Sequence, residues 1–134
     1  MKKKALVFCS AIFFSCSNDN DNNNNSPLRG KWYPRETLAN GTSHPYEDHE
    51  NCGKDYIQFY GSNSIKSVDV FDCESYTDWV GNYTQQENQL TISVQGTTRT
   101  FEILSLTETT LSLQYLNDYD LDGTLDTCID ILDK

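Results

Sequence analysis

The feature that most limits the fold of this chain is a period-two alternation of apolar and polar residues, which recurs from residue 28 onward. Successive side chains of a β-strand point to opposite faces, so this spacing predicts strands with one buried face each. No segment in this region has the spacing of an amphipathic helix. The alternating apolar positions are Leu90, Ile92 and Val94; Leu111, Leu113 and Tyr115; and the pairs Ile57 and Phe59, Val68 and Val70, Phe101 and Ile103, and Ile129 and Ile131.

Turn-forming residues such as Asn40-Gly41 and Asp122-Gly123 separate the alternating segments. Short strands joined by short turns favour an antiparallel, up-and-down order. Closing such a sheet into a barrel removes its exposed edges, so we expect an all-β, eight-stranded antiparallel barrel. A two-sheet sandwich is the alternative. The eight predicted strands lie near residues 30–38, 55–60, 65–72, 76–85, 89–95, 98–106, 109–117 and 125–132.

Residues 1–15 have the pattern of a signal peptide, with three consecutive lysines before an apolar run over residues 5–14. That run is shorter than the roughly 20 apolar residues that a membrane-spanning helix needs. The small residue Ser15 followed by Cys16 resembles the lipobox of bacterial lipoproteins, which implies that Cys16 is acylated, with palmitate for example, and becomes the first mature residue. Cys9 as acceptor, or an ordinary signal peptide with Cys16 as a bystander, are the alternatives.

Residues 17–26 are rich in Asn and Asp and offer nothing apolar to bury, which predicts a flexible tether that Pro27 ends. The chain is therefore expected to comprise a signal peptide (1–15), a lipidated cysteine with its tether (16–27) and one domain (28–134). The lipid would anchor the protein to the outer membrane of a bacterial cell envelope. Acidic residues soon after Cys16 resemble a surface-export tether, so periplasmic and surface-exposed orientations both remain open.

The predicted mature chain is strongly acidic. Removal of residues 1–15 leaves seven basic residues against twenty acidic ones, a net charge of −13. Such a charge repels phosphate backbones, so we expect no nucleic-acid partner. Such a charge either favours cations as partners or simply keeps the protein soluble.

The domain resembles the lipocalin-like domain of small bacterial lipoproteins. The residues that carry the resemblance are Gly30-Lys31-Trp32, Cys52 ahead of residues 54–59, Cys73, Gly81-Asn82-Tyr83 and Leu111-Ser112-Leu113. The resemblance covers residues 28–134 and implies a small up-and-down barrel with no assigned ligand. We expect Trp32 to close the barrel floor and its indole nitrogen to donate a hydrogen bond.

Three cysteines remain beyond the tether: Cys52, Cys73 and Cys128. An exported chain can form disulfides. We favour a Cys52–Cys73 bond, which would tie the loop before the second predicted strand to the end of the third and leave Cys128 free. A Cys73–Cys128 bond is the rival pairing.

An acidic segment near the C-terminus has the spacing of a calcium-binding loop. Three aspartates at alternate positions precede a glycine, and a backbone carbonyl and a fourth aspartate follow. The pattern lacks the glutamate at position twelve, and no helices flank it. An acidic hairpin that binds no ion is the alternative. The candidate calcium ligands are Asp118, Asp120, Asp122, Thr124 and Asp126.

Catalytic patterns are missing from the sequence. There is no Gly-x-Ser-x-Gly motif or phosphate loop, and both histidines fall in one loop. His49 and Cys52 have zinc-like spacing, but no second pair of ligands follows. We therefore expect a monomeric, non-catalytic module that contacts a small apolar molecule, a glycan or a protein. A calcium-stabilised structural or adhesion domain of the cell surface is the alternative.

Two sets of aromatic residues bear on ligand binding. Phe59, Tyr83, Phe101 and Tyr115 fall on the predicted inward face, which favours a mostly filled interior or a shallow mouth. A second set is expected at the surface, where it could contact a ligand: Tyr33, Tyr46, Tyr60, Trp79 and Tyr119.

Overall fold

The computed structural model describes residues 26–47 and 51–134. The predicted signal peptide, Cys16, most of the tether and His49 lie outside the described residues. Within the described residues no helix is long and apolar enough to cross a bilayer. The strands of this part of the chain are β1 (Gly30–Ala39), β2 (Thr42–Pro45), β3 (Tyr56–Tyr60), β4 (Ser64–Phe71), β5 (Glu74–Gln86), β6 (Gln89–Val94), β7 (Thr97–Leu106), β8 (Thr110–Asn117) and β9 (Asp126–Asp133).

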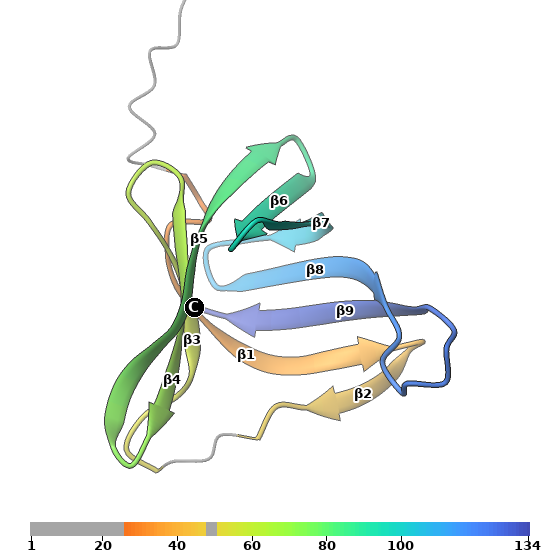
Figure 1. Cartoon of the computed structure of the whole chain (residues 1–134), viewed down its shortest axis with the longest axis horizontal. Coiled ribbons are helices and arrows are strands. Elements are labelled where there is room, and N and C mark those ends of the chain that lie inside the picture. The colour runs from red at the N-terminus through yellow and green to blue at the C-terminus, as the bar shows by residue number, and fades with distance from the viewer. Residues whose placement is uncertain (1–25, 48–50) are drawn as a thin grey trace, which may run out of the picture.

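Eight of these strands close into an antiparallel barrel (Figure 1). Strands β3 to β8 each pair with the next strand in the chain, β1 pairs with β3, and β9 returns to pair with β1. The predicted all-β, eight-stranded barrel is therefore confirmed, and the sandwich alternative is wrong. All eight predicted strands are present, with ends that differ by one or two residues.

Strand β2 is the one strand of the described residues that the sequence did not predict. It forms a hairpin with β1 through Asn40 and Gly41, whose φ angles of 47° and 83° are those of a tight hairpin turn. The turn was visible in the sequence, but residues 42–45 are polar and end in a proline. Strand β1 pairs with β3 through Gly30–Trp32 only, and β2 covers the same edge farther along.

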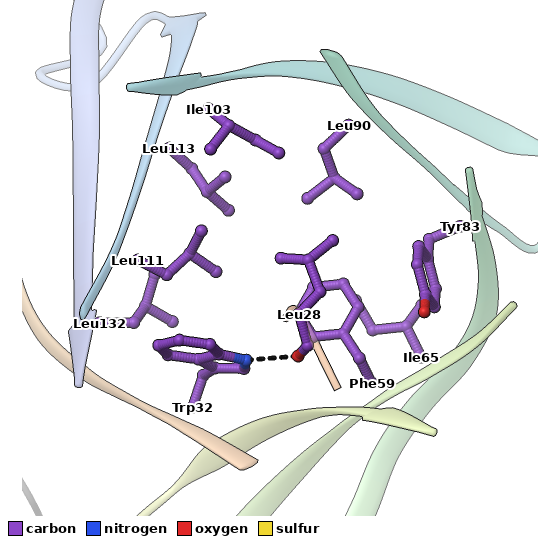
Figure 2. Packing of buried hydrophobic residues seen from close by; sticks show 10 residues of the cluster. All are labelled: Leu28, Trp32, Phe59, Ile65, Tyr83, Leu90, Ile103, Leu111, Leu113 and Leu132. Atoms are coloured by element: carbon purple, nitrogen blue, oxygen red, sulfur yellow. Dashed lines mark hydrogen bonds between the residues drawn. The ribbon is translucent and has the colours of Figure 1, made fainter. Parts of the chain in front are cut away.

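The floor of the barrel is a compact apolar cluster that includes Trp32 (Figure 2). Trp32 and Leu28 are both 0% exposed, and the indole Nε1 of Trp32 donates a 2.6 Å hydrogen bond to the carbonyl oxygen of Leu28. The predicted role of Trp32 is therefore confirmed. Each large side chain buried in this way contributes about 1.5–3 kcal/mol to folding. The cluster consists of Leu28, Trp32, Phe59, Ile65, Tyr83, Leu90, Ile103, Leu111, Leu113 and Leu132.

The inward face of β9 is the opposite of the one predicted. Cys128 and Leu132 are buried, at 0% and 5% exposure, whereas Ile129 and Ile131 are only partly buried. A shift of one residue moves every side chain of a strand to the other face. The sequence indicated the other face because the inward face carries the acidic Asp130. In the structure, hydrogen bonds from residues of two neighbouring strands stabilise the Asp130 carboxyl.

A disulfide joins Cys52 to Cys73, with 5.5 Å between their Cα atoms, and Cys128 is a buried free thiol. The favoured pairing is therefore present, and the rival pairing with Cys128 is wrong. The segment that carries Cys52 covers the outer end of β4. Within it, Asp55 Oδ1 accepts a 2.8 Å hydrogen bond from the backbone N–H of Val70, which is 6% exposed.

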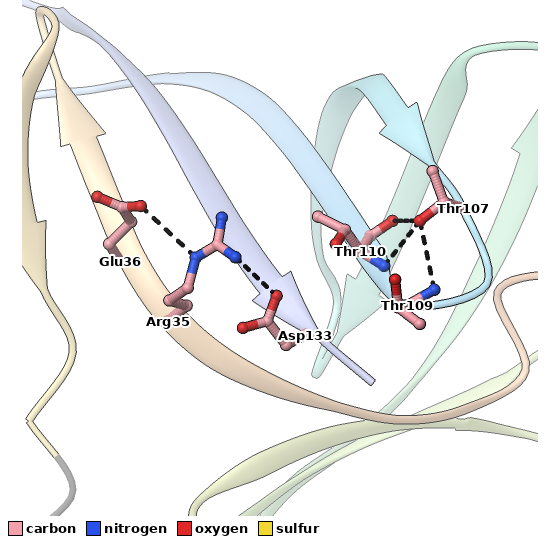
Figure 3. A network of polar contacts seen from close by, with 6 residues as sticks. All are labelled: Arg35, Glu36, Thr107, Thr109, Thr110 and Asp133. Atoms are coloured by element: carbon pink, nitrogen blue, oxygen red, sulfur yellow. Dashed lines mark hydrogen bonds and ion pairs between the residues drawn. The ribbon is translucent and has the colours of Figure 1, made fainter.

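Polar contacts on the outside of the barrel support its last strands (Figure 3). Arg35 Nη1 donates a 2.9 Å hydrogen bond to Asp133 Oδ1 across the β1–β9 seam, and Arg35 Nε lies 3.5 Å from Glu36 Oε1. Ion pairs this exposed contribute up to about 1 kcal/mol. In the β7–β8 turn, Thr107 Oγ1 accepts a 2.9 Å hydrogen bond from the backbone N–H of Thr110.

Candidate functional site

A cavity of about 550 Å³ occupies the barrel above its filled floor. Every strand contributes at least one lining residue, because each strand of a barrel alternates between inward and outward positions. Much of the wall is aliphatic or aromatic. Its apolar side chains include Ile57, Trp79, Ile92, Phe101 and Leu113.

The aromatic residues predicted to fill the interior divide between the two ends of the barrel. Phe59 and Tyr83 meet edge to face near the floor, with ring centroids 4.9 Å apart. Phe101 and Tyr115 also meet edge to face, at 5.3 Å, but they stand along the cavity wall. The sequence predicts a mostly filled interior or a shallow mouth; the floor is filled, and the upper half is an open cavity.

A carboxyl group faces this apolar cavity. Asp130 Oδ1 accepts a 2.7 Å hydrogen bond from Thr37 Oγ1 and a 3.2 Å hydrogen bond from the hydroxyl of Tyr115. Burial raises the pKa of Asp130, and these two hydrogen bonds offset part of that rise. Burial and the nearby Asp130 charge also raise the pKa of Tyr115, so its hydroxyl stays a donor at neutral pH.

Arg99 is the one lysine or arginine among the described residues that line the cavity, and its charge lowers the pKa of Asp130. Its guanidinium carbon lies 5.8 Å from the centroid of the Tyr115 ring, and the residue is exposed. No salt bridge joins Asp130 to a basic side chain among residues 26–47 and 51–134. The cavity therefore contains a carboxyl without an ion-pair partner in the described part of the chain.

The mouth of the cavity lies between the β1–β2 hairpin and the loop that joins β8 to β9. The His44 and Tyr119 rings lie 4.8 Å apart across this boundary, and the Tyr46 hydroxyl donates a hydrogen bond to Asp55. Three of the aromatics predicted as ligand contacts, Tyr46, Trp79 and Tyr119, do line the cavity.

The other two predicted aromatic contacts lie away from the cavity. The Tyr33 ring contacts the Tyr56 ring, with centroids 6.0 Å apart. The Tyr60 ring lies 5.7 Å from the ammonium of Lys66. These two side chains therefore belong to the outer surface.

A groove of about 840 Å³ lies along the β7–β8 boundary and shares three lining residues with the cavity: Arg99, Phe101 and Tyr115. It exists because β7 and β8 pair only between Glu102 and Leu106 of β7. The first residues of β7 pair with β6 alone. The groove itself is lined mainly by polar side chains, so the apolar cavity is the better candidate for a ligand site.

The acidic loop brings three of its aspartates together. One carboxylate oxygen from each of Asp118, Asp120 and Asp126 lies within 4.8 Å of the others. Asp122 is outside this group, and its Oδ1 accepts a 2.7 Å hydrogen bond from the backbone N–H of Thr124. Asp118 Oδ1 is buried and has no hydrogen-bond partner.

Asp126 ties the acidic loop to the cavity mouth. It is 8% exposed and accepts hydrogen bonds from the Asn40 side chain at 2.5 Å and from the backbone N–H of Tyr119 at 3.0 Å. Asn40 belongs to the β1–β2 turn and Tyr119 lines the cavity. The loop conformation therefore fixes one side of the mouth.

The sequence reasoning missed Asp130, Thr37 and Arg99 as cavity residues. The inward position of Asp130 could have been predicted from the sequence. Cys128, Asp130 and Leu132 are spaced two residues apart, so their side chains lie on the same face of a strand. Thr37 and Arg99 gave no such signal, because their role depends on which strands the closed barrel brings together.

Comparisons with known proteins support the barrel architecture. A family model for the lipocalin-like domain matches residues 28–113. The structure is similar to that of a lipocalin-like protein from Bacteroides uniformis, with a TM-score of 0.61 and 20% identity, over 81% of this chain and 99% of that chain. An uncharacterized protein from Bacteroides eggerthii gives a TM-score of 0.60 and 14% identity, over 80% and 98%. No curated protein matches the sequence.

Proposed function

This chain belongs to the family of lipocalin-like domains, and on that premise we propose that its barrel binds a small apolar molecule in the cavity above the Trp32 floor. The fold is typical of non-catalytic proteins that bind small hydrophobic ligands. The cavity itself supports the proposal most directly. Its volume of about 550 Å³ falls within the range of small-molecule sites, and its wall is rich in aliphatic and aromatic side chains.

Burial of apolar surface is the driving force we expect for binding. A ligand that loses about 200 Å² of apolar surface to this wall would gain about 5 kcal/mol before the entropic costs of association. The walls are already formed by the paired strands of a closed barrel, so little ordering should accompany binding.

The neutral fluorescent probe N-phenyl-1-naphthylamine tests the proposal. We expect saturable, one-to-one binding with enhanced emission. Ile92→Trp would fill the cavity and should weaken binding by at least tenfold. Thr91→Trp, on the outward face of the same strand, is the matched control and should bind as the wild type does. Equal binding by Ile92→Trp, or no saturable binding by the wild type, would overturn the proposal.

We propose further that the protein is exported and anchored to an outer membrane by a lipid on Cys16. The apolar run in residues 5–14 and the small residue before Cys16 support this proposal. Mass spectrometry of protein extracted from native membranes should find an acylated peptide that begins at Cys16. Cys16→Ser should leave the protein unacylated. An unmodified Cys16 in the native protein would rule the anchor out.

Calcium binding at the acidic loop is a second candidate function, favoured by one specific observation. Asp118 Oδ1 is buried without a partner, beside oxygens of Asp120 and Asp126. Uncompensated burial of such an oxygen is costly, and a hard cation with oxygen ligands would offset that cost. The bound ion would stabilise the loop that carries Tyr119 at the cavity mouth.

A thermal melt distinguishes an ion site from an empty acidic loop. Calcium chloride should raise the melting temperature, the chelator EGTA should reverse the rise, and Asp118→Asn should abolish it. Glu108→Gln, in the β7–β8 turn, is the control and should respond as the wild type does. An unchanged midpoint in the wild type would eliminate the calcium site.

A further inference from the structure

We propose that the molecule bound in this cavity carries a protonated amine on its apolar body, and that the carboxylate of Asp130 is the counter-ion. The inference rests on the proposed function of the cavity and names the class of ligand that it selects.

One oxygen of Asp130 is occupied and the other is available. The hydrogen bonds from Thr37 and Tyr115 both end on Oδ1. No described residue donates to Oδ2, which is neither hydrogen-bonded nor fully enclosed. Thr37 and Tyr115 come from β1 and β8, the two neighbours of β9, so the carboxyl is held in a fixed orientation. A donor group on a ligand would meet Oδ2 with little rearrangement.

No basic side chain of the described residues forms a salt bridge with this carboxyl, and the charge of Arg99 acts on it from beyond salt-bridge distance. Its charged form is disfavoured by burial, which raises the pKa of Asp130. A cation that enters the cavity offsets this cost, and a neutral alcohol offsets only part of it. Hydrogen bonds in which one partner is charged are about twice as strong as those between neutral groups.

The other charged residues on the wall do not favour an anionic ligand. Glu36 is paired with Arg35 at 3.5 Å. The charge of Arg99 already acts on Asp130 and lowers the pKa of that carboxyl, and its exposed guanidinium lies over the Tyr115 ring at the border with the outer groove. A carboxylate ligand would face Asp130 in a poorly hydrated space. The twenty acidic residues of the chain against ten basic ones add a field that attracts cations.

The aromatic part of the wall suits the same ligand class. Trp79, Phe101 and Tyr115 line the cavity with Asp130. Aromatic faces attract ammonium groups and also pack against flat apolar bodies. An amine attached to an aromatic ring would therefore use both parts of the wall.

Three matched probes test the inference: 2-(1-naphthyl)ethylamine, 2-(1-naphthyl)ethanol and 1-naphthylacetate. They share a naphthalene ring and differ in the group at the end. Isothermal titration calorimetry at neutral pH should show the amine binding about tenfold more tightly than the alcohol, a difference of about 1.4 kcal/mol. The acetate should bind most weakly. Equal affinities for amine and alcohol would overturn the inference but not the proposed function, which the alcohol alone tests.

The variant Asp130→Asn tests whether Asp130 is responsible for the preference for the amine. The asparagine carbonyl can still accept from Thr37 and Tyr115, so the variant should fold. The ratio of alcohol to amine dissociation constants should fall from about ten toward one. Asp133→Asn, on the outer face of the same strand, should keep the wild-type ratio. An amine preference that survives in Asp130→Asn would assign the selectivity to other residues and refute the role of Asp130.

Discussion

Asp130 is an acidic residue on the inward face of a strand whose neighbours at that face, Cys128 and Leu132, are buried. A carboxyl at such a position loses hydration, and the chain compensates with donors from β1 and β8. The compensation is partial, since the pKa of Asp130 remains above its ordinary value. This residue therefore affects stability as well as the chemistry of the cavity.

The raised pKa of Asp130 predicts a pH-dependent effect of Asp130→Asn on stability. Between the ordinary aspartate pKa and the raised folded-state pKa, the native protein holds the Asp130 proton more tightly than the unfolded chain does. The contribution of Asp130 to stability is thus largest at low pH and falls as pH rises through that window. The stability of Asp130→Asn relative to the wild type should therefore increase with pH across the window and then level off.

Urea unfolding at a series of pH values from 3 to 7 measures this effect. Glu108→Gln, at an exposed acidic residue of the β7–β8 turn, corrects for general changes in surface charge. A stability difference between Asp130→Asn and the wild type that stays flat or declines across this range would contradict the prediction.

The strands themselves were largely predictable because their signals are local. Alternation and turn residues located eight strands of the barrel to within one or two residues. Two errors had physical causes that a single segment does not contain. The short strand β2 exists because β1 leaves β3 after Trp32 and needs another partner. The face of β9 depends on hydrogen bonds to Asp130 from residues distant in sequence.

Gly81 in β5 is required by the close approach of a neighbouring strand. A methyl group at this position would lie 2.4 Å from the carbonyl oxygen of Ser93 in β6. Gly81→Ala must therefore push the two backbones apart, and we expect it to lower the free energy of unfolding by about 1–3 kcal/mol. Equilibrium unfolding in urea provides the measurement.

Gly96 provides the comparison, because a methyl group there would have nothing within 4 Å. Its φ of +82° makes Gly96→Ala costly by about 1 kcal/mol through backbone strain alone. Gly81→Ala should be the more destabilising variant. The opposite order would show that β5 and β6 can separate easily at this point.

The candidate site was less predictable than the fold because it belongs to the whole molecule. The cavity exists where inward side chains from nine strands leave space, and its volume depends on how Phe101 and Tyr115 stand against the wall. Sequence spacing found the acidic loop and three of the mouth aromatics. It did not reveal that the Asp122 carboxylate accepts a hydrogen bond from Thr124, or that Asp130 lines the cavity.

The Cys52–Cys73 disulfide should stabilise the molecule from outside the barrel. It joins residues 21 apart and holds the covering segment against β4. The double variant Cys52→Ser, Cys73→Ser should lose about 3 kcal/mol of stability, chiefly because the unfolded chain gains freedom. Urea unfolding of the variant should match that of the reduced wild type. A loss below about 1 kcal/mol would mean that the segment is held by its other contacts.

Both ends of the barrel domain meet at its floor. The Lys134 ammonium lies 4.9 Å from the centroid of the Trp32 ring and donates a 3.3 Å hydrogen bond to the carbonyl oxygen of Pro27. A protein held to a surface through the residues before Ser26 would therefore stand on its sealed base. Its binding chamber would open toward the surrounding medium, and a diffusing guest would arrive without passing the point of attachment.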